Sequence, residues 1–380
     1  MAEVGGTISP WMQQRFGRRA HMVVVGSGIV GLFTALFHKR RYPEHHVLVL
    51  ERGPFPSGAS VRNAGFACFG SPSEILADID AEGLDIALTR VEERWKGLQE
   101  LRAELTDAAI GFEATGGYEL FHANDALYTR TADRFDGLNT ALAGILGQAA
   151  YSWQDARKGD LGLATGHLAL CALEGPLNSG LLMQALLRKV QEAGVEVAFG
   201  ATVNSMEERN GAAQVRLIDH TVVQAEQVVI ATNGYLKQLL PEADVVPGRG
   251  QVLLTDPIPG LRLKGTFHAD EGYYYFRDFE GRVLLGGGRH LDKSGEITWE
   301  DGTTPRIQEA LEELLRTTII PGLPFTVEKR WSGVMGFRAA GKSPLIARHD
   351  ARTVVAAGLS GMGVAIGIRV ARQAAALAWS

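Results

Sequence analysis

The sequence predicts an α/β protein in which a Rossmann-like nucleotide-binding domain is joined to a second domain built on a mixed or antiparallel sheet. Residues 22–50 read as strand, glycine turn, helix and strand, the βαβ unit of a parallel sheet. Residues 249–288 contain successive strand patterns with turns between them, as in an antiparallel sheet. After Trp331 the α/β character returns, with a buried strand at 353–357, a glycine turn and an apolar helix at 364–379. The nucleotide-binding part is therefore expected to be discontinuous along the chain.

The first βαβ unit carries the glycine spacing of a dinucleotide site. Its turn has the order G-x-G-x-x-G at Gly26, Gly28 and Gly31, with Ile29 at the start of the helix. The first glycine permits the tight turn, the second lets a pyrophosphate approach the backbone, and the third lets helix and strand pack closely. The helix N-terminus then offers unpaired N–H groups to the phosphate charge.

An acidic residue stands where such sites bind the ribose. Glu51 directly follows the second buried strand, 47–50, and lies 20 residues after Gly31, with Arg52 next to it. A carboxylate at this place can accept hydrogen bonds from two ribose hydroxyls. The alternative is a glycine turn that only connects strand and helix. The complete context of strand, turn, helix, strand and acid favours dinucleotide binding.

The composition limits the classes of protein to which this chain can belong. At 380 residues with 46% hydrophobic residues, the chain should form about two globular domains. The net charge of −5, with scattered Lys and Arg, gives no sign of a nucleic-acid groove. No run of 18 apolar residues predicts a membrane span, and the N-terminus lacks the apolar core of a signal peptide. The two cysteines, Cys68 and Cys171, have no metal-ligand spacing, so we expect no metal site and a reducing cytoplasm.

The predicted division into domains follows the changes of pattern. The nucleotide-binding domain comprises residues 20–75, 165–245 and 335–380, the substrate domain residues 76–164 and 246–334, and an N-terminal arm residues 1–19. Other expected elements are a helix at 89–105, strands at 116–121 and 195–199, a helix from Ser179 to Ala193 capped by Ser179 and closed by Gly194, and a hairpin at 213–235. The Gly/Pro/Ser-rich residues 54–73 should form a long loop, which is usually functional.

Three glycine-bearing segments occur together in this chain: GSGIVG at 26–31, ATNGY at 231–235 and GLSGMG at 358–363. With ERG at 51–53 and SVRNAG at 60–65, they give the chain a specific resemblance to the D-amino-acid oxidase superfamily of FAD-dependent oxidoreductases. That superfamily includes glycine and sarcosine oxidases, D-amino-acid dehydrogenases and γ-glutamylputrescine oxidase. The resemblance covers roughly residues 22–378 and is strongest in the nucleotide-binding segments.

The resemblance implies a bound FAD and assigns residues to its parts. The glycine turn would hold the pyrophosphate, Glu51 and Arg52 would lie at the adenosine ribose, and the backbone of Val203 would pair with adenine. The loop beside the pyrophosphate and isoalloxazine would contain Ser60, Arg62, Asn63, Ala64 and Gly65, and the adenosine side would be closed by Ala231, Thr232, Asn233 and Gly234. The flavin pyrimidine would lie above Gly358, Leu359, Gly361, Met362 and Gly363. The helix that follows would stabilise negative charge on reduced flavin.

Three features of these segments have plainer alternatives. By itself GLSGMG could be a strand–helix turn, and Arg62 could be a surface charge, although it lies in an otherwise uncharged loop. Some relatives attach flavin through a cysteine far later in the chain, and no cysteine follows Cys171 here. Cys68 is expected to be a small buried packing residue. The FAD should therefore be non-covalent.

The substrate pocket is expected beneath the antiparallel sheet. Tyr273, Tyr274, Tyr275 and Arg277 lie on one strand, so Tyr275 and Arg277 face the same side. Aromatic walls exclude water from a hydride-transfer site, and an arginine can bind a carboxylate with two hydrogen bonds. The alternative is a half-buried aromatic strand with a surface arginine. Arg289 and His290, which follow three glycines, are second choices.

One departure from the family pattern concerns the carboxylate-binding arginine. Relatives that oxidise α-amino acids often carry W-x-G-L-R after the sheet, and here Met335 stands at the arginine position after Trp331. Arg338 comes three residues later. Either Arg338 takes over through a bulge near Gly336, or the carboxylate contact is absent, as in amine-oxidising members.

The expected function is oxidation of the C–N bond of a small amine or amino acid by hydride transfer to flavin N5. The electron acceptor would be O2 or another carrier, and the substrate should carry an anionic group held by Arg277 or Arg338. Within enzymes, the alternative is an FAD-dependent 2-hydroxy-acid dehydrogenase. From another class, the alternative is a flavin-binding subunit without turnover.

Overall fold

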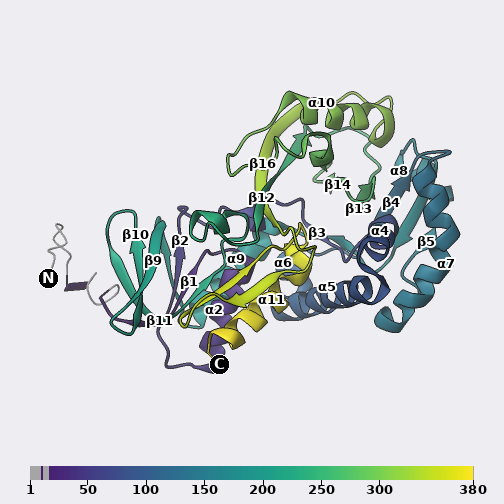
Figure 1. The fold of residues 1–380 in the computed structure, drawn as a ribbon. Coiled ribbons are helices and arrows are strands. Elements are labelled where there is room, and N and C mark those ends of the chain that lie inside the picture. The colour runs from purple at the N-terminus through teal and green to yellow at the C-terminus, as the bar shows by residue number, and fades with distance from the viewer. Residues whose placement is uncertain (1–9, 12–16, 380) are drawn as a thin grey trace.

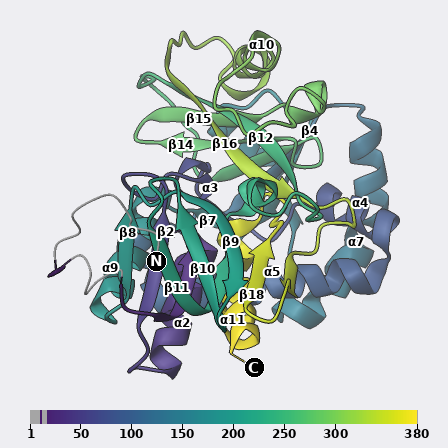
Figure 2. The same cartoon turned by 60° about the vertical axis from the view of Figure 1, so that its left-hand side comes forward.

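A computed structural model of the protein describes residues 10–11 and 17–379. Most of the N-terminal arm predicted for residues 1–19 lies outside the described residues. The fold is α/β, as the sequence predicts, with two large sheets. In Figure 1 the strands β12 and β16 rise through the centre toward α10, and Figure 2 places their sheet above the other one.

The lower sheet, which we call the nucleotide sheet, has the strand order β17-β18-β11-β1-β2-β8. Its strands are β1 (Ala20–Val25), β2 (Val47–Glu51), β8 (Glu196–Phe199), β11 (Val222–Ile230), β17 (Leu345–Arg348) and β18 (Thr353–Ala357). The pairs β1–β2, β1–β11, β2–β8 and β11–β18 are parallel. Strands β9 (Val203–Arg209) and β10 (Ala212–Leu217) extend β11 as an antiparallel hairpin. Both faces of the parallel strands are covered, which explains their continuous apolar runs.

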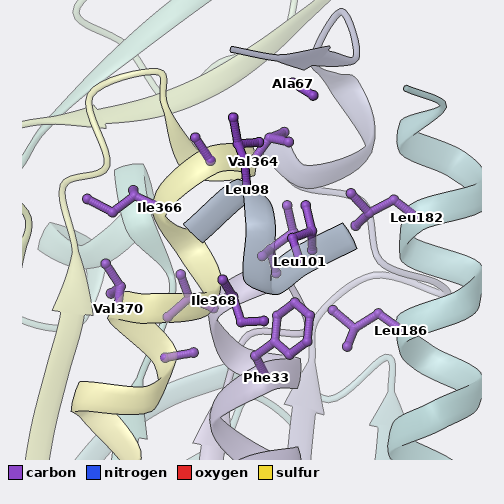
Figure 3. Close-up of a cluster of buried hydrophobic side chains, with 14 of the residues drawn as sticks. Phe33, Ala67, Leu98, Leu101, Leu182, Leu186, Val364, Ile366, Ile368 and Val370 are labelled. Atoms are coloured by element: carbon purple, nitrogen blue, oxygen red, sulfur yellow. The ribbon is translucent and has the colours of Figure 1, made fainter. Parts of the chain in front are cut away.

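Helices pack the core against this sheet. The main ones are α2 (Ile29–Arg41), α5 (Leu84–Leu105), α9 (Ser179–Glu192) and α11 (Gly363–Ala378). Figure 3 shows how their side chains interlock, with Phe33 from α2 beside Leu101 from α5, Leu186 from α9 and Ile368 from α11. A Cβ at Gly97 would overlap the Ala365 carbonyl, so α5 and α11 cross in backbone contact.

The upper sheet, which we call the roof sheet, has the order β16-β12-β15-β14-β13-β4-β6-β5. Its strands are β4 (Gly117–Phe121), β5 (Ser152–Trp153), β6 (His167–Cys171), β12 (Val246–Thr255), β13 (Thr266–Ala269), β14 (Tyr274–Phe279), β15 (Arg282–Gly287) and β16 (Val327–Phe337). All neighbours are antiparallel except β13 and β4, which makes the sheet mixed. Its outer face packs stacked aromatic rings against α10 (Pro305–Leu314).

The remaining elements are short or peripheral. The helices are α3 (Ala59–Arg62), α4 (Pro72–Glu82), α6 (Asp107–Ile110), α7 (Ala126–Leu146) and α8 (Lys158–Leu161). The short strands β3 (Phe66–Ala67) and β7 (Gly175–Pro176) pair with each other. Short 3₁₀ segments are η1 (Asp155–Arg157), η2 (Asn233–Gln238) and η3 (Arg289–Asp292), and η4 (Leu315–Ile319) is a π-helical turn.

Three local expectations differ from the structure. The side chain of Asn178, rather than that of Ser179, caps α9 by accepting from the backbone of Gly180 and Leu181. The expected loop at 54–73 contains α3 and β3. The predicted domain boundary at residue 165 precedes β6, which pairs with β4 in the roof sheet. The division into domains itself remains a prediction.

Candidate active site

One cavity of about 720 Å³ runs from the nucleotide sheet to the underside of the roof sheet. Its floor is formed by the segments that follow β1, β2, β11 and β18, where the carboxyl ends of parallel strands meet. Its far wall is formed by β12, β14, β15 and β16. The volume lies in the range of small-molecule and cofactor sites.

The turn after β1 has the shape that its glycines predict. Gly26 has a φ of +104°, and a Cβ there would lie 2.9 Å from the Ala231 carbonyl oxygen. A Cβ at Gly31 would overlap the Gly26 carbonyl, so Gly31 sets the contact between α2 and the turn. Ser60 Oγ accepts a hydrogen bond of 3.0 Å from the backbone N–H of Ile29 at the head of α2.

Glu51 is buried at the cavity wall and already oriented. Its carboxylate accepts from the Ser27 N–H at 3.0 Å, the Ser27 hydroxyl at 2.6 Å and the Gly53 N–H at 2.9 Å. Beside it, the Arg52 guanidinium stacks on the Tyr235 ring at 3.8 Å, and both residues line the cavity.

The loop after α3 is held by its own polar side chains. Asn63 donates to the carbonyls of Ala59 and Ser60 and accepts from the Gly65 N–H. Arg62 pairs with Asp301 at 2.6 Å and is one-third exposed. Arg62 is therefore both a cavity-lining residue and a link to the roof side of the molecule.

Asn233 joins the two later glycine turns. Its Oδ1 accepts from the N–H groups of Gly358 at 3.0 Å and Leu359 at 3.3 Å. This contact fixes the segment that leads into α11, whose N-terminus lines the cavity.

The structure brings most of the predicted cofactor residues to the cavity wall. These are Gly26, Gly28, Ile29, Glu51, Arg52, Ser60, Arg62, Asn63, Ala64, Val203, Ala231, Thr232, Asn233, Leu359, Gly361, Met362 and Gly363. Four predicted glycines do not line it: Gly31, Gly65, Gly234 and Gly358. Each permits a close approach behind the wall instead, because a Cβ there would overlap a neighbouring carbonyl or, at Gly358, the Arg338 side chain.

These features together fit FAD. A backbone cradle without Cβ atoms, the head of a helix and an adjacent buried acid suit a pyrophosphate and a ribose. The family model "FAD dependent oxidoreductase" (DAO) matches residues 21–377 of the chain. The chain belongs to this family. It is an FAD-dependent oxidoreductase.

Curated relatives are distant and longer. The chain is 25% identical over 324 residues to the bifunctional protein ThiO/ThiG of Synechocystis sp., a match that covers 82% of the chain and 44% of that protein. It is 25% identical over 285 residues to the probable oxidoreductase OrdL of Rhizobium meliloti, which covers 71% of the chain and 64% of that protein. The chain thus spans less than two thirds of these relatives.

Solved structures share the fold over nearly the whole chain. L-proline dehydrogenase from P. horikoshii has a TM-score of 0.74 at 18% identity, with 95% of this chain and 93% of that chain covered. Glycine oxidase from Geobacillus kaustophilus has a TM-score of 0.72 at 22% identity, covering 95% and 94%. Iminodiacetate oxidase from Chelativorans sp. BNC1 has a TM-score of 0.73 at 19% identity, covering 93% and 94%.

The roof of this oxidoreductase's cavity is aromatic, and glycines make room for it. Tyr275 pairs across β14–β15 with Gly286, where a Cβ would overlap the tyrosine ring. Tyr273, Met335 and Phe337 complete this part of the wall. Burial raises the pKa of Tyr275 to about 12, so its hydroxyl stays protonated and can donate.

Two of the three predicted catalytic residues do not line the cavity. Arg277 shares a strand face with Tyr275, but its Nη1 donates to the carbonyls of Leu177 at 2.7 Å and Gly65 at 3.1 Å. Arg338 points to Asp244 at 3.3 Å and to the Ser343 carbonyl at 3.1 Å. The expectation that either one holds the substrate is therefore corrected, because both guanidinium groups are used to join chain segments.

Ionisable side chains other than Arg277 and Arg338 line the cavity wall. Arg289, a second choice from the sequence, lines the cavity with its guanidinium over the Phe337 ring at 4.1 Å. His268, Glu74 and Lys342 also line it, and sequence reasoning missed all three. His268 lies on β13, a strand of only four residues that no pattern predicted, directly opposite Tyr275 in the register.

The charges of these groups follow from their surroundings. Burial lowers the pKa of His268 to about 4, against the opposing effect of the Glu74 carboxylate, so the imidazole is neutral at pH 7. Glu74 pairs with Arg94 at 3.2 Å, and Lys342 lies 3.9 Å from Glu74.

The two cysteines are free and buried. Cys68 lines the cavity, and burial raises its pKa well above the usual range, which keeps its sulfur a neutral thiol. Non-covalent FAD binding remains a prediction.

Within residues 10–11 and 17–379, none of the helices is both long and apolar enough to cross a membrane. In the same residues, no group of three or more His, Cys, Asp or Glu is arranged to hold a metal ion.

Proposed function

We propose that this FAD-dependent oxidoreductase oxidises the C–N bond of a small amine or amino acid. The observation that carries the proposal is that one continuous cavity joins the dinucleotide cradle to an aromatic pocket. FAD, when bound, accepts a hydride at N5 and so supplies the redox chemistry. Structures of similar fold include enzymes named for glycine, L-proline and iminodiacetate, which all contain nitrogen and carboxyl groups.

The pocket residues position the substrate and exclude water from it. Tyr273, Tyr275, Met335 and Phe337 form an apolar wall that excludes water from the reacting carbon. The N-terminus of α11 faces the cavity, where its partial positive charge favours an electron-rich ring.

His268 is the residue best placed to contact the amine. A hydride leaves the carbon only when the neighbouring nitrogen has a free lone pair, so the amine must be neutral. The neutral imidazole of His268 can accept a hydrogen bond from an amine N–H. No protein group of the described chain hydrogen-bonds to the His268 ring, although the ring packs on Phe66 with centroids 5.1 Å apart. In this proposal the substrate nitrogen lies beside His268.

An anaerobic screen tests the function. The FAD-loaded protein is mixed with small amines, amino acids and 2-hydroxy acids, and bleaching of the flavin absorbance is recorded. We expect saturable bleaching by one group of amines or amino acids. Bleaching by 2-hydroxy acids alone would make the protein a hydroxy-acid dehydrogenase, and no bleaching by any of them would favour a flavin-binding subunit without turnover.

A further inference from the structure

Arg289 is a partly buried cation whose guanidinium has no hydrogen-bond or ion-pair partner among the described residues. It follows the end of β15, where Gly287 and Gly288 have φ values of +125° and +73° and turn the chain back toward the cavity. In the described part of the chain, no hydrogen bond and no ion pair joins its guanidinium to another residue. Its contact is the face of Phe337, which leaves the edge of the guanidinium free.

The neighbouring arginines show that this state is exceptional. Arg249 binds Glu296 through two hydrogen bonds of 2.7 and 2.9 Å, and Arg94 donates to the Phe69 carbonyl and pairs with Glu74. Arg52 also lines the cavity without such a pair, but it is exposed to solvent.

The carboxylate that interacts electrostatically with Arg289 is already occupied. Glu296 is fully buried and interacts with Arg289 only electrostatically, since its two carboxylate oxygens accept from Arg249 and Gln251. Burial lowers the pKa of Arg289, yet a guanidinium remains charged at any ordinary pH. A partly desolvated charge with free donors is costly unless an anion meets it.

The shape around Arg289 suits a carboxylate. Gly248 makes room for the Phe337 ring, because a Cβ there would lie 2.4 Å from Phe337 Cε2 and 3.7 Å from Arg289 Nη1. The Arg289 guanidinium carbon lies 4.1 Å from the centroid of the Phe337 ring, and a guanidinium with free donors can offer two parallel N–H groups to a planar two-oxygen acceptor. Met335 lines the same wall at the position where the sequence pattern led us to look for an arginine.

We propose that Arg289 binds the carboxylate of the substrate, so that the substrate class is an amine with one carboxylate group. The inference rests on the proposed function, because it assigns the orientation of a substrate within the same pocket. The carboxylate lies on the Phe337 side, and the nitrogen lies toward His268 and Tyr275. Two other cations of the cavity wall are already paired, since Lys342 is held by Asp78 and lies near Glu74, and Arg62 pairs with Asp301.

Binding of carboxylates that cannot be oxidised tests the proposal without turnover. The FAD-loaded protein is titrated with acetate and with benzoate, and the visible flavin spectrum reports binding. We expect R289M to raise the dissociation constant ten- to a hundredfold, because a charged hydrogen bond is lost. The dissociation constant of R289K should lie between those of the wild type and R289M, because lysine keeps the charge but cannot donate two parallel hydrogen bonds.

The control variant is K293M, which removes a cation from the same turn, outside the cavity wall. It should bind carboxylates like the wild type, and all variants should keep their flavin content and melting temperature. Wild-type binding of carboxylates by R289M would overturn the proposal, as would a wild type that oxidises only uncharged amines. If carboxylates bind through Arg289 but no amine bleaches the flavin, the proposed function fails and the anion site stands.

Discussion

Glu51, which we propose for the ribose of FAD, has an orientation that the protein has already fixed. Three donors, from Ser27 and Gly53, hold its carboxylate at the cavity wall. We expect Glu51→Gln to raise the dissociation constant for FAD about ten- to a hundredfold, since a charged acceptor for the ribose becomes neutral and one of its oxygens becomes a donor. Reconstitution of apoprotein, followed by flavin fluorescence, measures this. The exposed Glu309→Gln on α10 is the control, and equal affinities would remove Glu51 from the ribose site.

His268 should shape substrate binding without giving the reaction its pH dependence. Because burial lowers its pKa to about 4, the ring stays neutral between pH 6 and 9, and only below about pH 5 does protonation begin to remove the acceptor. The rate of anaerobic flavin reduction should therefore follow the pKa of the substrate amine in that window. His268→Asn should raise the substrate dissociation constant several-fold and leave the midpoint of the profile unchanged.

His290→Asn is the matched control for that experiment. His290 is half-buried near Tyr273 but does not line the cavity, so neither the affinity nor the midpoint should move. A midpoint that shifts in the His268 variant would show that this imidazole titrates during the reaction, contrary to our assignment.

The residues that form the glycine cradle and most of the adjoining cavity wall could be predicted from sequence, whereas the arginine that we assign to the substrate could not. The cradle is made by contacts within short turns, such as Gly26 with Gly31, and local spacing reports these directly. The fate of Arg277 depends on the carbonyls of Gly65 and Leu177, which are 212 and 100 residues away. No local pattern could show that the Arg277 guanidinium is occupied, or that the Arg289 guanidinium has no hydrogen-bond partner in the part of the chain that the structure describes.

At the scale of elements, the crossing of α5 and α11 determines where the floor of the cavity lies. Gly97 lets the backbones touch at Ala365, two residues into α11. We expect Gly97→Ala to lower the free energy of unfolding by about 1–3 kcal/mol through overpacking. It should also reduce the FAD content, because the overlap at Ala365 must displace the start of α11, which lines the cavity. Urea unfolding and the absorbance ratio of the purified protein give the two values.

An exposed helical glycine provides the comparison. At Gly144 on α7 an added Cβ would meet open space, so Gly144→Ala should stabilise the protein by up to about 1 kcal/mol through helix propensity. If both variants gain stability, the helices are not in the backbone contact described.

Elements with a strong pattern were predictable, and those defined by pairing were not. The buried strand at 353–357 and the closing helix appear within a residue of their predicted bounds, because apolar runs and glycine turns mark them. Strand β13 has four residues and is held in place by its neighbours β14 and β4, which a sequence does not show. The position of β6 in the roof sheet likewise follows from pairing with β4.

At the scale of the whole molecule, the cavity lies between the nucleotide sheet and the roof sheet. Arg62 reaches from the nucleotide side to Asp301, and Trp299 donates to the Gly234 carbonyl at 2.8 Å. A ligand bound in this cavity contacts the nucleotide-sheet side and the roof-sheet side together. FAD should therefore stabilise the complete fold, because anything that binds only the native state shifts unfolding by mass action.

Buried carboxyl groups below the roof sheet make global stability depend on pH. Burial raises the pKa of Glu119 to about 7, although Ser71 and Ser73 donate to it, and raises the pKa of Glu174 to about 8. The ordinary glutamate value is 4.5, so the unfolded chain ionises from that pH upward while the folded protein keeps both protons. Stability must then fall as pH rises from about 4.5 through 7 to 8.

Glu119→Gln tests this dependence, since it keeps the neutral shape and cannot ionise. Near pH 5 the variant and the wild type should unfold at similar urea concentrations, and by pH 8 the variant should be more stable by about 2–3 kcal/mol. Tryptophan fluorescence at a fixed excess of FAD follows the unfolding. The exposed Glu242→Gln should show no such divergence. A constant difference between Glu119→Gln and wild type across this range would mean that Glu119 ionises normally in the fold, with its three serine donors outweighing burial.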